Sequence, residues 1–264
     1  MYPAYMFLVC VSWNFSETLK KSYPPDRQET TMTDLPGYPS RRSFLKASAA
    51  SVMLSGLAVS AKAEPQTPPV PLEQYERQYF NEVEWAFVLA ATARLIPSEG
   101  DGPGAIEARV PVFIDLQLAG DFGRADDWYM VGPHDPSADP TRGWQTPLNP
   151  AQIYRQGIPA FNAWCEQKYG AAFSALTAEQ QDAALTSLQK GEVGLQPELR
   201  DFFTLLLQNT KEGYFADPMY GGNHGMQAWS YIGFPGARGS YKEWVERYNV
   251  RYPLGPVSIK GERA

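Results

Sequence analysis

The stretch FNEVEWAFVLAATARLIP, Phe80 to Pro97, has the pattern of an amphipathic helix with a marked start and a marked end. Asn81 is a capping residue and Glu84 stands at the third helical position, so the two predict a reciprocal capping box. Phe80 and Trp85 occupy the positions of a hydrophobic staple around that cap. Pro97 ends the helical pattern. The apolar face consists of Trp85, Val88, Leu89, Thr92, Leu95 and Ile96.

The remainder of the chain carries five further helical signals, each with a start or stop residue. Asn149 followed by Pro150 opens the longest one, and Gly170 closes it. Thr177 and Gln180 form another capping box. No segment shows sustained alternation of apolar and polar residues, so the sequence predicts a mainly α fold of about six helices with long ordered loops. The five segments are 111–120, 149–170, 177–191, 197–206 and 240–248.

A twin-arginine export signal is predicted by SRRSFLK, Ser40 to Lys46. A charged segment, an apolar run and a small-x-small cleavage site are the three parts of a bacterial secretory signal, and the arginine pair selects the twin-arginine route. The apolar run, 47–60, is too short and too rich in serine for a membrane anchor, which needs about 20 apolar residues. The signal residues are Arg41, Arg42, Phe44, Leu45 and Lys46, with cleavage after the Ala61 to Ala63 triplet.

The export signal divides the chain into segments. Residues 1–63 are read as the leader, and Met32 is an alternative start that would leave 1–31 untranslated. A proline-rich linker, 64–79, is expected to precede a single helical domain, 80–259, and a short tail, 260–264. Cleavage after Ala63 leaves 201 residues, enough for one domain with its own core.

The expected mature chain is acidic, with 16 basic and 25 acidic side chains. Nucleic acids and anionic membranes favour basic patches, so this balance argues against both as the main partner. No direct membrane span is expected after cleavage.

Cys165 is the single cysteine of the expected mature chain, which rules out an internal disulfide there. An odd cysteine in an exported protein is either a buried thiol or a partner in an intersubunit disulfide. Cys165 shares one helical face with Tyr154, Ile158 and Phe161, which favours a buried thiol, and the intersubunit disulfide remains the alternative.

The sequence predicts no catalytic, cofactor or metal site in this chain. The nearest approach to a dinucleotide fingerprint, Gly100, Gly102 and Gly104, has the wrong spacing and follows no strand. One cysteine supports neither covalent haem nor an iron–sulfur cluster. His134 and His224 lie far apart in loops, without the further ligands that zinc requires.

The glycine-rich stretch GYFADPMYGGNHG, Gly213 to Gly225, allows two interpretations. Asp217-Pro218 and the adjacent glycines are typical of a packed turn, which we interpret as an interface loop. The alternative is a stand-alone enzyme that uses the Asp217 to His224 loop for acid–base chemistry. The interface interpretation is favoured because no nucleophile–base pair is recognisable. Its candidate residues are Tyr214, Phe215, Asp217, Tyr220 and Asn223.

Several segments together resemble the gluconate 2-dehydrogenase subunit 3 family, the small subunit of membrane-associated sugar and sugar-acid dehydrogenases. The matching stretches include EWAFVLAATARLIPS and GAIEARVPVFIDLQLAG. The most specific are QNTKEGYFADPMYGGN and GFPGAR. The resemblance covers nearly all of 80–259.

The resemblance implies a complex in which this chain is the non-catalytic subunit. Such complexes contain a large FAD subunit that oxidises the sugar and a multihaem cytochrome c subunit that passes electrons onward. The small subunit is expected to bind and stabilise the flavin subunit and to supply the signal recognised by the twin-arginine translocase. The expected location is the periplasm, at the outer face of the cytoplasmic membrane.

Overall fold

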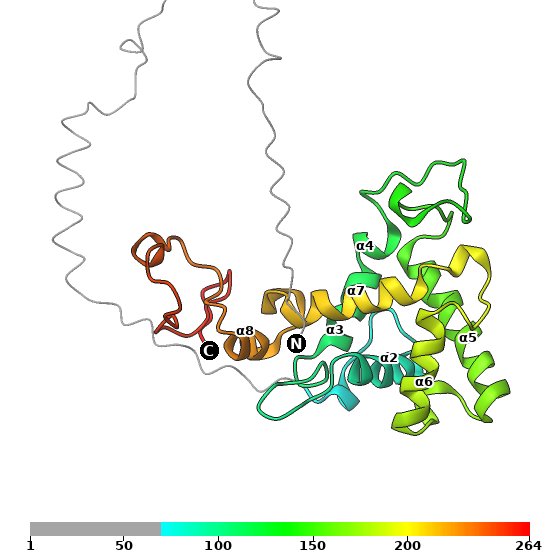
Figure 1. Ribbon diagram of the computed structural model, residues 1–264, viewed down its shortest axis with the longest axis horizontal. Coiled ribbons are helices and arrows are strands. Elements are labelled where there is room, and N and C mark those ends of the chain that lie inside the picture. The colour runs from blue at the N-terminus through cyan, green and yellow to red at the C-terminus, as the bar shows by residue number, and fades with distance from the viewer. Residues whose placement is uncertain (1–69) are drawn as a thin grey trace, which may run out of the picture. The chain divides into compact units, whose positions relative to one another are not determined.

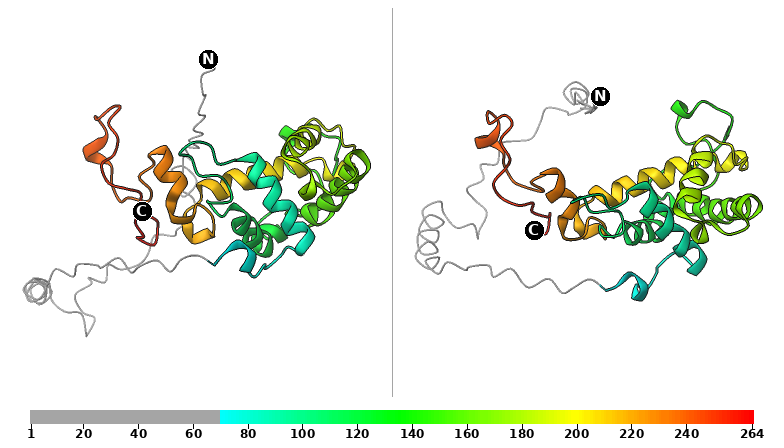
Figure 2. Two further views of the ribbon diagram at one scale, coloured as in Figure 1. Left: turned by 90° about the horizontal axis from the view of Figure 1, so that it is seen from below. Right: turned by 60° about the horizontal axis from the view of Figure 1, so that its bottom comes forward.

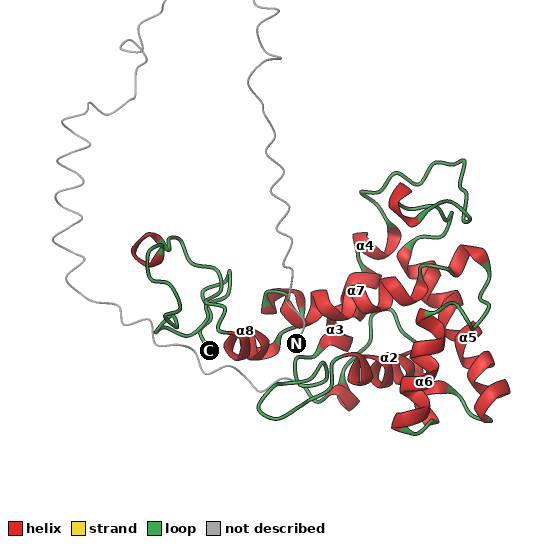
Figure 3. Cartoon of the chain, viewed as in Figure 1, coloured by secondary structure: helices red, strands yellow, loops and turns green. Residues whose placement is uncertain are grey.

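The computed structural model describes residues 70–264, which form helices, turns and loops without any strand (Figure 3). The predicted mainly α fold is confirmed. The α-helices of this part are α2 (Glu82–Leu95), α3 (Val110–Ala119), α4 (Asp121–Arg124), α5 (Pro150–Tyr169), α6 (Ala178–Gln189), α7 (Phe202–Phe215) and α8 (Gln227–Ile232) (Figure 1).

The predicted caps of α2, α5 and α6 are confirmed. The side chains of Asn81, Asn149 and Thr177 each accept a hydrogen bond from a backbone N–H in the first turn. The side chain of the Glu or Gln at the third helical position in turn accepts from the backbone N–H of the capping residue. Each capping box satisfies amide groups that have no partner within the helix. Phe80 and Trp85 are both buried with ring centroids 6.5 Å apart, as expected for the staple.

The α2 helix is the centre of the core, since it contacts α3, α5, α6 and α7. Phe87 is fully buried, and its ring centroid lies 5.2–6.1 Å from those of Phe161, Phe173 and Phe202. Aromatic pairs at such distances contribute beyond the burial of their area. One residue of α2 thus joins side chains from α5, α7 and the turn before α6.

Gly157 explains how closely α5 and α7 approach. A Cβ atom at this position would lie 2.7 Å from the ring of Phe202. Glycine inside a helix costs roughly 1 kcal/mol relative to alanine, and the close contact with Phe202 offsets that cost here.

The prediction of a helix at 240–248 is wrong. Only a 3-10 turn, Lys242–Trp244, forms there. Ser240 accepts from Lys242 N instead of capping a longer helix. Tyr241 and Trp244 pack on Tyr252, and not on the helical core. An apolar stripe stabilises a helix only when it has a surface to bury against.

The helix predicted at 197–206 has different bounds. Pro197 opens a 3-10 turn, Pro197–Leu199, and α7 begins only at Phe202. The segment 120–148 contains the short α4 and a 3-10 turn, Pro140–Arg142, and is otherwise irregular. A 3-10 turn, His224–Met226, leads directly into α8.

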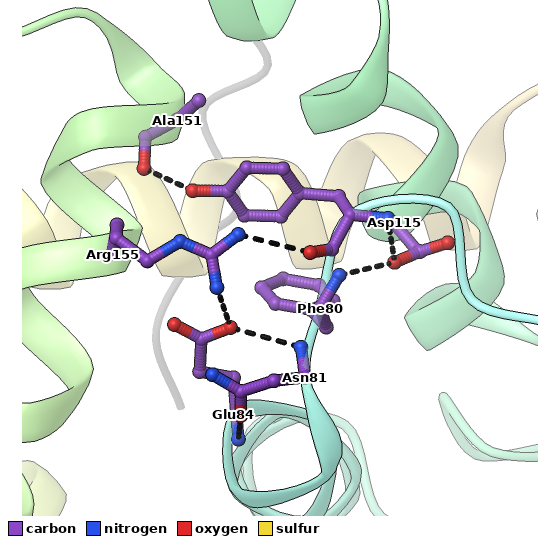
Figure 4. Close-up of polar contacts among 7 residues, drawn as sticks. Phe80, Asn81, Glu84, Asp115, Ala151 and Arg155 are labelled. Carbon is purple, nitrogen blue, oxygen red and sulfur yellow. Dashed lines mark hydrogen bonds and ion pairs between the residues drawn. The ribbon is translucent and has the colours of Figure 1, made fainter.

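The segment before α2 is attached to the helices through Asp115 of α3 (Figure 4). The Asp115 carboxylate is fully buried and accepts from the backbone N–H groups of Gln78, Tyr79 and Phe80 at 2.6–3.0 Å. It also accepts from the Tyr75 hydroxyl at 2.9 Å. Burial and the charge of Asp115 raise the pKa of Tyr75, which keeps this hydroxyl protonated as a donor. Residues 75–80 therefore lie bound to the domain.

Arg155 of α5 completes this attachment (Figure 4). Its guanidinium pairs with the buried Glu84 carboxylate and donates to Tyr79 O at 2.9 Å. It also lies 4.3 Å from the centroid of the Tyr79 ring. The start of α2 is thereby fixed to both α3 and α5.

Replacement of Asp115 by Asn should destabilise the fold. The amide NH₂ would face backbone donors, so at least one buried N–H would lose its acceptor, at about 2–4 kcal/mol in the free energy of unfolding. Thermal and urea unfolding of the purified chain measure the loss. Asp127→Asn, at an exposed position, is the matched control. Equal stability of the two variants would contradict the role given to Asp115.

Candidate interaction surface

The last turn of α7 and the turn after it contain glycines whose positions leave no room for a side chain. A Cβ on Gly213 would lie 2.7 Å from the Phe113 ring, and a Cβ on Gly222 would lie 2.1 Å from Gly213 O. Gly221 has φ +92°, a conformation that glycine adopts without strain. Gly222 does not adopt a positive φ and is required instead for its close approach to Gly213 O.

Asp217 is a structural residue of this turn. It is 7% exposed, and one carboxylate oxygen accepts from Met219 N at 3.1 Å. The other oxygen accepts from Ile259 N at 2.7 Å. Asp217 therefore joins the turn after α7 to the C-terminal segment of the chain.

Asn223 holds the return of the chain toward α8. It is fully buried in a left-handed conformation, with φ 43°. Its amide nitrogen donates to Ala216 O at 2.9 Å, and its oxygen accepts from Ala228 N at 3.1 Å. The Trp229 indole donates to Phe215 O at 2.8 Å across the same turn. The side chains of Asp217 and Asn223, two of the polar groups in the loop proposed for acid–base chemistry, are thus occupied by backbone partners.

Two of the five candidate interface residues expose their side chains. Phe215 and Tyr220 are exposed by nearly half, whereas Tyr214 is buried and donates from its hydroxyl to Pro103 O at 2.7 Å. Further large apolar side chains are exposed nearby, and together they define the α7–α8 surface. Its members are Leu116, Phe215, Met219, Tyr220, Tyr231, Ile232 and Phe234.

Neighbouring residues contact individual members of the α7–α8 surface. Gly221 lies against Leu116, and the Trp229 ring is 5.1 Å from Phe234 while its indole bonds the carbonyl of Phe215. Sequence reasoning missed Leu116 and the α8 residues, because exposure depends on which neighbours the fold supplies. The glycine-rich composition before α8 was the only signal near them.

His224 does not complete an acid–base pair with Asp217. Its backbone N–H donates to Ala108 O at 3.2 Å. Burial and the neighbouring Arg109 lower the pKa of His224, so its imidazole is neutral at pH 7. Among the described residues no group of three potential metal ligands is found. What this loop offers most directly is an exposed apolar surface on a rigid turn.

Cys165 lies in the core of the described domain. Its side chain is fully buried on α5, and burial raises the pKa of its thiol to about 12. The thiol is free in this chain. A disulfide with a partner would require this part of α5 to become accessible.

The predicted export signal lies outside the described residues. Arg41, Arg42, Phe44, Leu45, Lys46, Ala61 and Ala63 all precede residue 70, so their roles stay predictions. In the described part, 70–264, no helix has the length and apolar character needed to cross a membrane.

Comparison with known proteins identifies one family. The family model described as gluconate 2-dehydrogenase subunit 3 matches residues 82–236, more than half of the chain. The matched range runs from the first residue of α2 through the turn that follows α8. It therefore contains nearly all of the core and the whole α7–α8 surface. No curated protein and no solved structure matches the chain.

The Cys165 thiol should resist alkylation in the folded chain at pH 8. A thiol whose pKa is about 12 carries little thiolate at that pH, and burial blocks the reagent as well. Iodoacetamide labelling followed by mass spectrometry, with and without urea, measures the protection. Labelling of the native chain at the rate of the urea-unfolded chain would show that Cys165 is accessible.

Proposed function

Because the chain belongs to the gluconate 2-dehydrogenase subunit 3 family, we propose that it is the non-catalytic small subunit of a periplasmic sugar or sugar-acid dehydrogenase. In this proposal it binds the FAD-containing large subunit and stabilises it. It also supplies the twin-arginine signal with which both proteins are exported. A multihaem cytochrome c subunit would accept the electrons.

The observation that carries this proposal is the α7–α8 surface. Seven large apolar side chains are exposed there around a turn. Close contacts of glycine residues and buried hydrogen bonds hold this turn in place. Clustered apolar exposure on a rigid support is typical of a protein-binding site. Aromatic residues and Met are enriched in interface cores, and five of the seven residues are of these types.

Polar groups of the loop support binding over catalysis. The Asp217 carboxylate and the Asn223 amide each make two hydrogen bonds that maintain the backbone. Using the Asp217 carboxylate for proton transfer, or the Asn223 amide as a donor to a substrate, would break a contact that shapes the surface. The chemistry is therefore assigned to the flavin subunit.

Stabilisation of the flavin subunit follows from mass action. A partner that binds only the folded state adds RT ln(1 + [L]/Kd) to the free energy of unfolding, about 2.7 kcal/mol at a hundredfold excess over Kd. An interface on the order of 2,000 Å² is expected for a permanent complex of this kind. Such a complex would leave the cytoplasm already folded around FAD.

Arg41→Lys combined with Arg42→Lys should strand both subunits in the cytoplasm. The lysine pair keeps the charge but loses the arginine pair that selects the twin-arginine route. Cell fractionation with immunoblots for both subunits measures the effect. Arg77→Lys, at an exposed position after the signal, is the control. If the flavin subunit still reaches the periplasm when it is coexpressed with the double variant, this chain does not supply its export signal.

Met219→Asp combined with Tyr220→Asp should weaken capture of the flavin subunit at least tenfold. Charged side chains in a desolvated interface core cost binding free energy, and tenfold corresponds to about 1.4 kcal/mol. Titration of the purified subunits gives Kd, and circular dichroism checks the fold. Tyr129→Asp with Val131→Asp alters an exposed Tyr–Val pair outside the α7–α8 surface as a control.

Sugar-dependent dye reduction by the isolated chain, without flavoprotein, would instead support the stand-alone enzyme. Inactivity alone, together with copurification of a yellow partner, supports the proposed function. The two outcomes are distinguished in one preparation.

A further inference from the structure

Residues 237–255 form a loop that extends away from α8 and then returns toward it (Figure 2). We name it the C-terminal loop. Its base is closed by backbone hydrogen bonds from Ala237 N to Val257 O at 2.7 Å and from Val257 N to Pro235 O at 3.3 Å. Gly236 permits this closure, because a Cβ there would lie 2.2 Å from Val257 O. The Asp217 carboxylate accepts a hydrogen bond from Ile259 N and so fixes the segment that follows the loop.

The C-terminal loop has its own small interior. The Tyr252 ring lies 4.9 Å from Trp244 and 6.2 Å from Tyr241, with the Arg238 guanidinium 4.8 Å from its centroid. Arg247 lies 4.7 Å from the Trp244 ring. Aromatic and cation–π contacts therefore fix the conformation of the loop without using the helical core.

The rest of the C-terminal loop is exposed. Sixteen of its nineteen residues are exposed, and the three exceptions, Arg238, Trp244 and Tyr252, belong to its interior. Val245 is 67% and Tyr248 79% exposed, and Val250 and Leu254 are also more than half exposed. An ordered loop that presents four large apolar side chains to water is better explained as a binding element than as a connection.

The charge of the C-terminal loop is opposite to that of the domain. The loop contains four basic and two acidic side chains, whereas residues 70–236 contain ten basic and twenty-one acidic ones. The loop therefore suits an acidic counterpart with apolar recesses. Its Tyr, Trp and Arg residues are the types that contribute most to binding free energy at interfaces.

A pocket of about 330 Å³ lies between the base of the loop and α8. It is lined by Trp229 and Phe234 from the α8 side and by Arg251, Tyr252 and Leu254 from the loop. Phe234 also belongs to the α7–α8 surface. The pocket has room for an apolar side chain of a partner, and it makes the loop continuous with that surface.

We propose that the C-terminal loop is a second docking element for the flavin subunit, and that it engages an acidic, apolar-lined groove on that subunit. The inference rests on the proposed function, since that supplies the partner. A standard interface uses about 20–30 residues a side. The α7–α8 surface supplies seven large apolar residues, and the sixteen exposed loop residues would extend the contact toward that size.

A lipid surface and a second copy of this chain are the alternative partners of the loop. The four basic side chains of the loop would favour an anionic bilayer, but Glu243 and Glu246 flank Trp244 and Val245 and place carboxylates beside these apolar side chains. A loop-to-domain contact between two copies would be reciprocal in a two-fold dimer or heterologous in rings and filaments, and either would make the isolated chain self-associate. A groove on a different protein requires neither bilayer binding nor self-association.

Val245→Asp combined with Tyr248→Asp tests the inference, because both side chains are exposed and neither belongs to the interior of the loop. Full-length chain is coexpressed with the flavin subunit, and Kd is measured by titration of the purified partners. We expect Kd to rise at least tenfold, whereas Tyr129→Asp with Val131→Asp, an exposed Tyr–Val pair elsewhere, leaves it unchanged. An unchanged Kd for the loop variant overturns the inference.

A charge-reversal variant, Lys242→Glu with Arg251→Glu, tests the acidic counterpart. The association rate should fall about tenfold at low salt and lose most of its dependence on salt. An association rate equal to that of the wild type would overturn the inference that the partner groove is acidic.

Three controls separate this inference from its alternatives. If wild-type chain does not capture the flavin subunit at all, the proposed function itself fails, which differs from a failure of the loop variant alone. Loop-dependent self-association of the isolated chain in sedimentation velocity would assign the loop to a second copy. Loop-dependent binding to vesicles of phosphatidylglycerol and phosphatidylcholine would assign it to a membrane, and either result overturns the inference.

Discussion

The Asp115 carboxylate is the constraint on which the arrangement of the described domain depends. It accepts hydrogen bonds from three consecutive backbone N–H groups and from the Tyr75 hydroxyl at a fully buried site. A buried carboxylate is tolerated only when such donors surround it. These bonds fix the segment before α2, the staple formed by Phe80, and thereby the helix that contacts α3, α5, α6 and α7.

Asp217 serves the C-terminal part of the chain in a similar way. Its two oxygens bind the turn after α7 and the backbone of Ile259. Two buried aspartates thus attach the segments on either side of the helical core, by hydrogen bonds from backbone to carboxylate. In a chain rich in acidic residues, the most deeply buried aspartates have structural partners, and the distinctive exposed features are apolar and aromatic.

A rigid core and ordered surface elements together make a binding role physically consistent. The α7–α8 surface stands on glycine contacts that leave little freedom, and the C-terminal loop is stabilised by its own aromatic interior. Elements that are ordered before binding lose less conformational entropy on association. Two such elements on one chain can bind a single partner with higher affinity than either provides alone, provided that both reach it.

The sequence alone determined the helical class, the capping boxes at Asn81 and Thr177, the N-cap at Asn149 and the glycine turn after α7, because each depends on residues a few positions apart. It also carried the family resemblance. Only the tertiary structure decided the rest. Asp115 bonds residues 35–40 positions away, and the helix expected at 240–248 fails because no core surface covers its stripe. Which aromatic side chains remain exposed likewise depends on distant neighbours, since burial is a property of the packed fold and not of local spacing.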